Sequence, residues 1–248
     1  MKPNLKQQRA AFTFPELLVV IVVVFVLVSM LLPARSGSHK STRIYCVNNL
    51  KEIGTAYRVW EGDNGDLVPP QQSVSNGGWK DLLTNANQGV ICWTNYAIMA
   101  GELGQSPKLV VCSSDDRKAA ASFTNKFDNT HVSYFIGVSA NDMYPQSIAA
   151  GDRNLGPGTV PDAHYGFSPE NGKGNDVAVP IAGPVWWSLK MHSAGNTAGA
   201  GNILLGDGSG QQVSSGSFNK NWLPNAPPTT NWPKGHVPAT PSIRLVFP

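Results

Sequence analysis

The pattern of hydrophobic and polar residues changes along the chain. A continuous apolar run comes first, then apolar residues at helical spacing, and then short segments typical of β-strands. Residues 17–32 read LLVVIVVVFVLVSMLL, in which Ser29 is the one polar residue and no residue is charged. At 1.5 Å per residue, a helix from Phe12 to Leu32 is roughly 30 Å long, the thickness of a bilayer hydrocarbon core. The pattern predicts a transmembrane or assembly helix over residues 12–33.

A second helical pattern follows a polar, basic segment at residues 34–43. Apolar side chains recur three and four positions apart at Cys46, Leu50, Ile53, Tyr57 and Trp60. This spacing places them on one face of an amphipathic helix, and the glycine-rich segment 61–65 should end that helix. We therefore expect residues 34–62 to form a spine for the rest of the chain, joined to the first helix and loosened around Pro33.

Residues 63–248 have the pattern of a loop-rich β domain. The chain has 25 Gly, 19 Pro and only 14% charged residues, which disfavours a helical bundle. The strand signals lie at residues 108–112, 131–138, 186–190 and 243–247. Short helices are expected near residues 79–83, 94–100 and 117–121, and residues 141–180 should be mostly loop. The expected fold class is α+β: a long N-terminal α-helix packed on an antiparallel β-sheet head with a Pro-rich C-terminal segment.

An Asp-Gly pair separates two short runs late in the chain. Asp207-Gly208 follows residues 202–206 and precedes residues 209–213. Asp and Gly both tolerate the positive φ of a type I′ turn, so the sequence predicts a β-hairpin here.

Three cysteines, Cys46, Cys92 and Cys112, leave one thiol over if a disulfide forms. Cys46–Cys112 is the favoured pair because it would tie the spine helix to the head, and Cys92–Cys112 is close behind. No CxxC occurs and no His is near a Cys in the sequence, so we expect no metal site of this kind.

Glu16 lies at the start of the apolar run and needs a partner there, since an unpaired carboxylate near lipid is costly. The segment AFTFPELL, residues 11–18, resembles the N-terminal signal of type IV pilins and type II secretion pseudopilins. In that family a peptidase cuts a basic leader, the new N-terminus is methylated, and a Glu stands fifth in the mature chain. The resemblance implies a leader at residues 1–11, cleavage at Ala11–Phe12, methylation of Phe12 and an assembly role for Glu16.

Two positions refine this resemblance. Ala11 stands where the family usually has Gly, and Pro33 stands where these proteins often carry a helix-loosening proline. The resemblance further implies that Glu16 of one subunit pairs with the Phe12 amine of its neighbour. Each charge would then offset the desolvation of the other.

The basic leader accounts for the formal net charge of +3. Lys2, Lys6 and Arg9 are the basic residues of the leader, which has no acidic residue, so the mature chain is neutral. The charge is therefore no sign of nucleic-acid binding. It fits a cytoplasmic N-terminus and a C-terminal head in the periplasm or outside the cell.

A second resemblance concerns pilin-like proteins of planctomycete-type bacteria. Those proteins carry a Cys-x-Asn-Asn-Leu-Lys segment on the spine helix, a cysteine before Ser/Pro-Asp, and a His followed by Asp-Gly. The corresponding residues here are Cys46–Lys51, Cys112–Asp115, and His192 with Asp207 and Gly208. The separation of His192 and Asp207 is longer than is typical of those proteins.

Enzymatic chemistry has little support in the sequence. His192, Asp207 and Ser188 could form a catalytic triad, but no nucleophile elbow, P-loop, dinucleotide fingerprint or HExxH occurs. Asp115 and Asp116 could bind calcium, although their spacing matches no EF-hand and a solvated helix cap is the better interpretation. We therefore expect no catalysis and no cofactor.

The sequence favours a structural subunit of a pilus or secretion pseudopilus. It would be anchored in the inner membrane, processed by prepilin peptidase, and assembled with other pilins or pseudopilins through the N-terminal helix. The alternative is a membrane-anchored extracytoplasmic binding module, with polysaccharide as the candidate ligand. Tryptophans such as Trp186, Trp187, Trp222 and Trp232 could stack on sugars, although packing explains most of them better.

Overall fold

The structure is a computed structural model of the 248-residue chain. It describes residues 12–31, 38–84, 91–161, 163–174, 179–181, 183–193, 198–223 and 243–248. The chain divides into two compact units, Met1–Ser38 and His39–Pro248. Ala11 and Pro33, to which the sequence assigned cleavage and helix loosening, lie outside the described residues.

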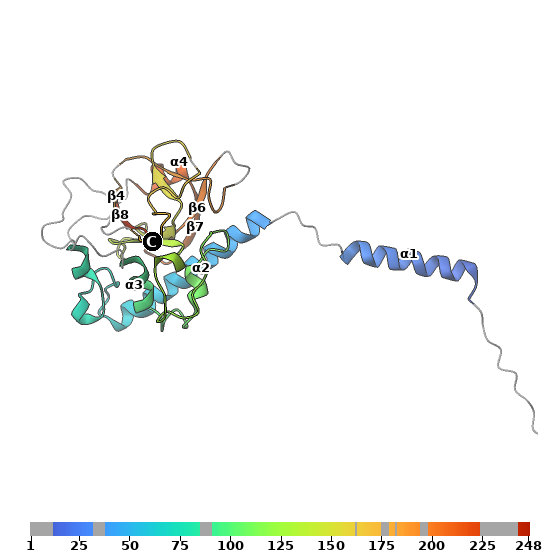
Figure 1. Cartoon of the computed structure of the whole chain (residues 1–248), viewed down its shortest axis with the longest axis horizontal. Coiled ribbons are helices and arrows are strands. Elements are labelled where there is room, and N and C mark those ends of the chain that lie inside the picture. The colour runs from blue at the N-terminus through green and yellow to red at the C-terminus, as the bar shows by residue number, and fades with distance from the viewer. Residues whose placement is uncertain are drawn as a thin grey trace, which may run out of the picture. The chain divides into compact units, whose positions relative to one another are not determined.

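The first unit contains helix α1, Phe14–Leu31 (Figure 1). Its large apolar side chains from Leu17 to Val28 are all about half exposed or more. The helix begins with a capping interaction, because the Thr13 backbone N–H and hydroxyl both donate to Glu16 Oε2 at 2.8 Å. None of the described helices is long and apolar enough to cross a membrane.

The second unit is an α+β head built on helix α2, Ser38–Asp63. The predicted apolar face of this helix is buried: Cys46, Leu50, Ile53, Tyr57 and Trp60 are each at most 6% exposed. The helix ends at a glycine-rich turn, as expected, and Gly65 there has a φ of +69°. The predicted continuity of the two helices concerns residues 32–37, which lie outside the described residues.

The head has eight strands among its described residues, six of them in one antiparallel sheet of order β4-β8-β1-β2-β6-β7. The strands are β1 Tyr134–Gly137, β2 Ile148–Asp152, β3 Leu155–Pro157, β4 Val179–Ile181, β5 Val185–Trp187, β6 Ala200–Leu205, β7 Gly210–Ser214 and β8 Ile243–Val246. Strands β3 and β5 form a separate pair. The other helices are α3 Ile91–Ile98, α4 Ser215–Asn221, and the 3₁₀ helices η1 Val74–Asn76, η2 Lys80–Thr84, η3 Pro107–Val110 and η4 Asn129–His131.

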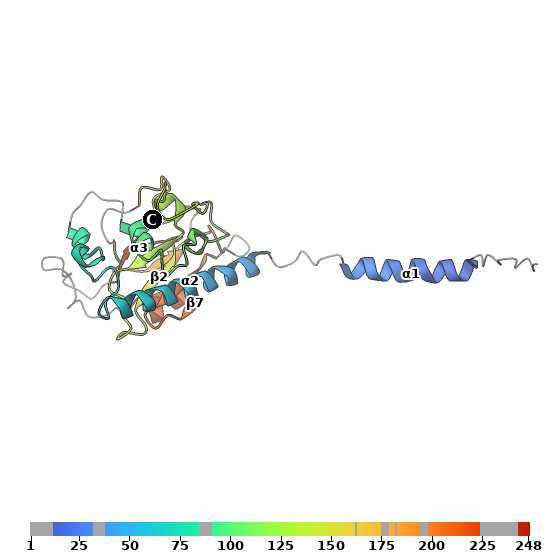
Figure 2. The ribbon, with the colours of Figure 1, turned by 90° about the horizontal axis from the view of Figure 1, so that it is seen from below.

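The six-stranded sheet is covered on both faces. Tyr134, Ile136 and Leu204 belong to a core cluster with the apolar face of α2 and with α3. Phe135, Ile203 and their neighbours instead pack with Trp187 of β5 and Phe218 of α4. Adjacent residues of one strand therefore enter different cores, which follows from the two-residue period of a strand. Figure 1 shows α2 and α4 on opposite sides of the sheet, and Figure 2 shows α2 running along the strands.

Several sequence predictions for the head agree with the structure. The strand at residues 131–138 contains β1, those at 186–190 and 243–247 overlap β5 and β8, and the short helices near 79–83 and 94–100 overlap η2 and α3.

Other local predictions were wrong. Residues 108–112 do not form a strand, because Pro107 starts the 3₁₀ helix η3 there. Residues 117–121 do not form a helix. The Arg117 side chain instead donates to backbone oxygens of Asn129, Val132, Pro169 and Pro248, which ties this segment to three others.

Three strands lie in the region that was expected to be mostly loop. Strands β2, β3 and β4 fall within or at the edge of residues 141–180. Strand β2 has the sequence IAAGD, which is poor in β-branched and aromatic residues. It forms because β1 and β6 pair with it on either side, so tertiary pairing overrides the weak local preference.

Gly54 marks the closest approach of α2 to the β6–β7 hairpin. A Cβ at this position would lie 2.8 Å from Leu204 Cδ1 and 3.1 Å from the Gly208 oxygen. Gly54→Ala should therefore lower the free energy of unfolding by about 1–3 kcal/mol through overpacking, despite a gain of about 1 kcal/mol in helix propensity. The control is Gly62→Ala, near the end of the same helix with nothing within 4 Å, which should be neutral or stabilising. Urea unfolding measures both, and stabilisation by Gly54→Ala would contradict this packing.

Candidate functional site

The N-terminal segment places its two sequence-predicted residues at the start of α1. Phe12 is 82% exposed and precedes the helix. Glu16 lies in the first turn and bonds to Thr13 of its own chain. A Glu at this position satisfies the backbone N–H that the helix itself leaves free. Glu16 thus has a local partner in the isolated chain, and any contact with a neighbouring chain would have to replace it.

A disulfide joins the start of the spine helix to the head. Cys46 of α2 is bonded to Cys112, which follows η3, and both are fully buried. This is the pairing that the sequence favoured, and Cys92 is a buried thiol. The bond closes a loop with a sequence separation of 66 residues, for which the chain-entropy relation gives about 4 kcal/mol of stabilisation.

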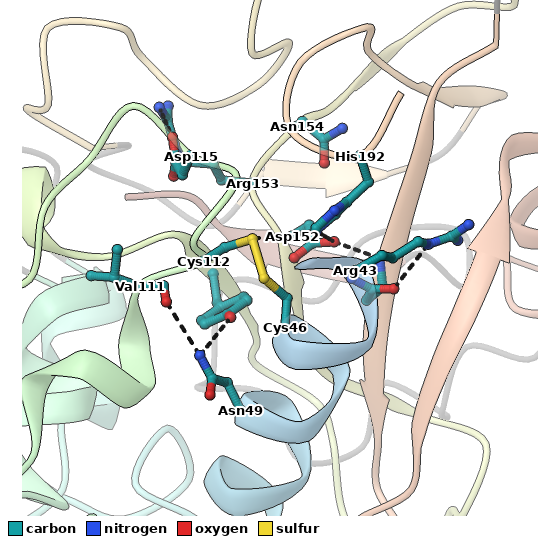
Figure 3. Close-up of a disulfide and its surroundings, with 12 residues drawn as sticks. Arg43, Cys46, Asn49, Val111, Cys112, Asp115, Asp152, Arg153, Asn154 and His192 are labelled. Carbon is teal, nitrogen blue, oxygen red and sulfur yellow. Dashed lines mark hydrogen bonds and ion pairs between the residues drawn. A yellow bond between two sulfur atoms is a disulfide. The ribbon is translucent and has the colours of Figure 1, made fainter. Parts of the chain in front are cut away.

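Polar residues from α2 itself, from the end of β2 and from the loop before β6 lie around this disulfide (Figure 3). The Cys112 Sγ lies 3.3 Å from His192 Nε2, and the same nitrogen lies 3.4 Å from Asp152 Oδ2 at the end of β2. Both of these polar side chains are fully buried. We refer to Arg43, Cys46, Cys112, Asp152 and His192 as the disulfide cluster.

Arg43 and Asn202 hold the carboxylate side of the cluster. The Asn202 backbone N–H donates to Asp152 Oδ2 at 2.7 Å. Arg43 donates to Asn202 Oδ1 at 3.2 Å and to the Gly201 oxygen at 2.9 Å. Among the described residues, Asp152 Oδ1 and His192 Nδ1 are buried without a hydrogen-bond partner. The cluster therefore contains two buried polar atoms without hydrogen bonds, and leaving such atoms unpaired destabilises the folded state.

Burial determines the protonation states in the cluster. It raises the pKa of Asp152 to about 8, although the Asn202 hydrogen bond and the Arg43 charge both act to lower it. It lowers the pKa of His192 to about 4, and the Arg43 charge acts in the same direction. A separation of 3.4 Å would suit an ion pair, but these pKa values favour the uncharged forms of both groups at neutral pH.

Asp115 and Asp116, the candidates for calcium binding, have separate protein partners. Arg153 donates to both oxygens of Asp115 at 2.8 Å. Burial alone would raise the pKa of Asp115, but the hydrogen bonds and charge of Arg153 leave that pKa lowered. Asp116 accepts from the Tyr165 hydroxyl at 2.8 Å, and the Arg153 guanidinium stacks 3.3 Å from the centre of the Tyr165 ring. Both carboxylates therefore have protein hydrogen-bond partners within the head, which account for their positions without a calcium ion.

The structure separates the residues of the suggested triad. His192 contacts Asp152 and Cys112, whereas Asp207 Oδ1 accepts from the Ser209 N–H at 2.8 Å within the β6–β7 turn. The Ser188 hydroxyl is buried and accepts from the Lys190 N–H. Among the described residues, the three groups thus have separate partners and do not form the hydrogen-bonded chain of a catalytic triad.

Asp207 and Gly208 do form a hairpin turn, but not of the expected type. Gly208 has a φ of +79°, while Asp207 is not among the residues with positive φ. The Gly208 N–H donates to the Leu205 oxygen at 2.9 Å and the Leu205 N–H to the Ser209 oxygen at 3.0 Å. This is a three-residue loop that ends in a left-handed glycine, instead of a type I′ turn.

The tryptophans that suggested sugar stacking are largely in the core. Trp186 is 4% exposed and donates to the Pro157 oxygen, and Trp187 is fully buried against Phe218. Trp222 is partly buried and packs on the second core cluster, while Trp232 lies outside the described residues.

Sequence reasoning missed Asp152 and Arg43 and gave His192 the wrong neighbours. His192 is 80 positions from Cys112, so no local spacing could indicate their contact. The one available signal was the charged pair Asp152-Arg153 directly after the small, uncharged run IAAG, since charged residues beside a buried segment need partners.

Comparison with protein-family models, curated proteins and solved structures gives no match for this chain.

The opposite pKa shifts of Asp152 and His192 predict an unusual pH dependence of stability. Between pH 6.5 and 8 the unfolded Asp152 is ionised while the folded carboxyl keeps its proton. Stability should therefore fall as the pH rises, by at most about 1.4 kcal/mol per pH unit. Between pH 4 and 6.5 the neutral buried His192 contributes the opposite slope, and the two contributions offset each other.

Asp152→Asn isolates the two contributions. The stability of the variant should no longer decline above pH 6.5. Between pH 4 and 6.5 its stability should increase as the pH rises, because only the His192 contribution remains. The nearby charges of Arg43 and Asp115 are the same in both proteins, so urea unfolding of the oxidised chain at a series of pH values compares them directly. A variant that keeps the wild-type decline would show that Asp152 is not the group responsible.

Proposed function

We propose that this chain is a pilin-like or pseudopilin-like structural subunit that assembles through its N-terminal helix. The observation that carries the proposal is α1, a helix whose exposed side chains from Leu17 to Val28 are all apolar. Such a surface in water costs about 25 cal/mol per Å². It therefore needs a cover, and lipid before assembly and neighbouring copies of the helix afterwards would both provide one.

The head supports the proposal through its construction. The buried apolar stripe of α2 makes this helix part of the core, and the Cys46–Cys112 bond fixes it to the loop after η3. With α2 fixed in this way, a pull on the N-terminal helix would not detach α2 from the rest of the head. A disulfide also suits a head exported to the periplasm or the cell exterior.

Glu16 supplies the register between subunits in this proposal. After cleavage the Phe12 amine of one subunit would take up Glu16 of its neighbour, in exchange for the local contacts with Thr13. Within an apolar bundle the charged pair forms only at one axial offset, because any other offset leaves both charges uncompensated.

Processing is tested by the mass of the N-terminal peptide from chain made together with a prepilin peptidase. We expect a chain that starts at N-methylated Phe12. The comparison is Ala11→Gly, which restores the residue usual before the cut. If both proteins retain Met1, the proposed processing is wrong. If only the Gly variant is cut, Ala11 prevents maturation and the assembly proposal fails for this chain.

Assembly is tested with Glu16→Gln and Glu16→Ala in a filament or cross-linking assay. Loss of one member of a buried pair costs about 3–5 kcal/mol, so both variants should need at least about 100-fold more protein to assemble. Gln can still accept from Thr13 as a helix cap, so Glu16→Gln separates the charge from capping. The control is Glu52→Ala, an exposed acid on α2. Normal assembly of Glu16→Gln would contradict the charge-pair mechanism.

A second candidate function, an anchored binding module, has one observation in its favour. The head has an open surface pocket of about 520 Å³ lined by charged residues that include Lys118, Arg153, Glu170 and Lys190. Its volume is within the range of small-molecule sites. The aromatic ring there, Tyr165, is stacked by Arg153, so the pocket offers less to a sugar ring than an open aromatic face would.

A further inference from the structure

The disulfide cluster brings together the donor atoms of a metal site. The sulfur atoms of Cys46 and Cys112 and a ring nitrogen of His192 all lie within 4.8 Å of one another, and all three residues are buried. They come from α2, from the segment after η3 and from the loop before β6. Two thiolates and an imidazole are the donors of many tetrahedral zinc sites.

Asp152 lies beside these three residues and could supply a fourth donor after a small side-chain movement. Its Oδ2 lies 3.4 Å from His192 Nε2, and its other oxygen has no hydrogen-bond partner among the described residues. In a tetrahedral site with Zn–N and Zn–O bonds of about 2.05 Å, the nitrogen and the oxygen are about 3.4 Å apart. With a Zn–S bond of about 2.3 Å, a sulfur and a nitrogen are about 3.6 Å apart, and Cys112 Sγ lies 3.3 Å from His192 Nε2. Both distances from His192 Nε2 are therefore close to those between ligand atoms of a tetrahedral zinc site.

The charges also fit a divalent ion. Two thiolates and one carboxylate carry three negative charges, and Zn²⁺ with Arg43 carries three positive charges. The Asn202 backbone N–H bonds to Asp152, and its side chain accepts from Arg43. These contacts orient the carboxylate from outside the site, as the outer partners of metal ligands commonly do.

We propose that in the dithiol form of the chain Cys46, Cys112, His192 and Asp152 bind one Zn²⁺, and that disulfide formation releases it. The proposal does not depend on the function proposed above. The Cα atoms of the two cysteines are 5.4 Å apart, and rotation about their side-chain bonds lets two thiolates separate to the roughly 3.8 Å of a tetrahedral site. Zinc would hold α2 to the head before oxidation, where the disulfide holds it afterwards.

The exchange is balanced with a disulfide as oxidant. The two zinc-bound thiolates lose two electrons and form the Cys46–Cys112 bond. A small-molecule or protein disulfide gains those two electrons and leaves as two thiolates. The Zn²⁺ ion keeps its charge and enters solution, because the oxidised sulfurs are no longer thiolate ligands.

The first experiment adds Co²⁺, and then competing Zn²⁺, to the full-length chain reduced under anaerobic conditions in detergent. Cobalt reports thiolate ligation through a charge-transfer band and tetrahedral geometry through intense visible bands. We expect one metal per chain with both signatures, and a raised Tm of the reduced chain on zinc addition. Oxidised glutathione should then release one zinc per disulfide formed, as measured with a chromophoric chelator.

Variants assign the ligands. Cys46→Ala and Cys112→Ala should lower metal affinity at least about 100-fold, and His192→Gln and Asp152→Asn about 10- to 100-fold and change the visible cobalt bands. The matched control is Cys92→Ala, which removes the buried thiol outside the cluster and should bind like the wild type. Circular dichroism of each variant checks that it is folded. Absence of the charge-transfer band in the folded, reduced wild type would overturn the proposal, as would unchanged binding in both His192→Gln and Asp152→Asn.

Discussion

The packing of α2 on one face of the six-stranded sheet is the contact on which the head depends. The buried stripe from Cys46 to Trp60 meets residues of β1, β2, β6 and β8 in one core cluster. Since the other face of the sheet is closed by β5 and α4, the strands are buried on both sides. Removal of α2 would expose much of the face that it shares with α3. The Cys46–Cys112 bond limits this loss, because it ties the helix to the segment after η3 even in the unfolded chain.

The N-terminal part of α2, around Cys46, packs against polar residues, unlike the rest of the helix. Along most of α2 the buried neighbours are apolar, but around Cys46 they are Asp152, His192 and the partners of Arg43. Burial of such groups is costly unless they are paired, and here the pairing is incomplete. The redox state of Cys46 and Cys112 determines the role of the cluster. The oxidised sulfurs form a covalent bond between α2 and the head, and in the proposed reduced form the two thiolates are metal ligands.

The two long helices differ in where their apolar residues lie. In α2 these residues form one stripe that the sheet covers, and the opposite face carries polar residues such as Lys51 and Glu52. In α1 they cover every side. A helix of the first kind completes its burial within its own head. A helix of the second kind calls for apolar surroundings from outside its unit, which is the physical basis of the proposed assembly role.

Features that depend on the local order of residues could be predicted from the sequence. The apolar run at residues 17–32, the stripe of α2, strand β1 and the turn at Gly208 are encoded in periodicity, β propensity or a single glycine, and each needs only near neighbours along the chain. The Glu16–Thr13 cap is local in the same sense. Pro107 was equally visible, and a greater weight on its fixed φ would have indicated η3 instead of a strand.

Contacts between residues that are distant in the sequence depend on the tertiary fold. Strand β2 has weak β propensity and exists because β1 and β6 bond to it. His192 has Asp152 and Cys112 as neighbours, instead of Asp207, because the order of strands brings the end of β2 beside the loop before β6. Contacts of this kind depend on which strands pair with each other, and the spacing of residues along the chain does not indicate that pairing.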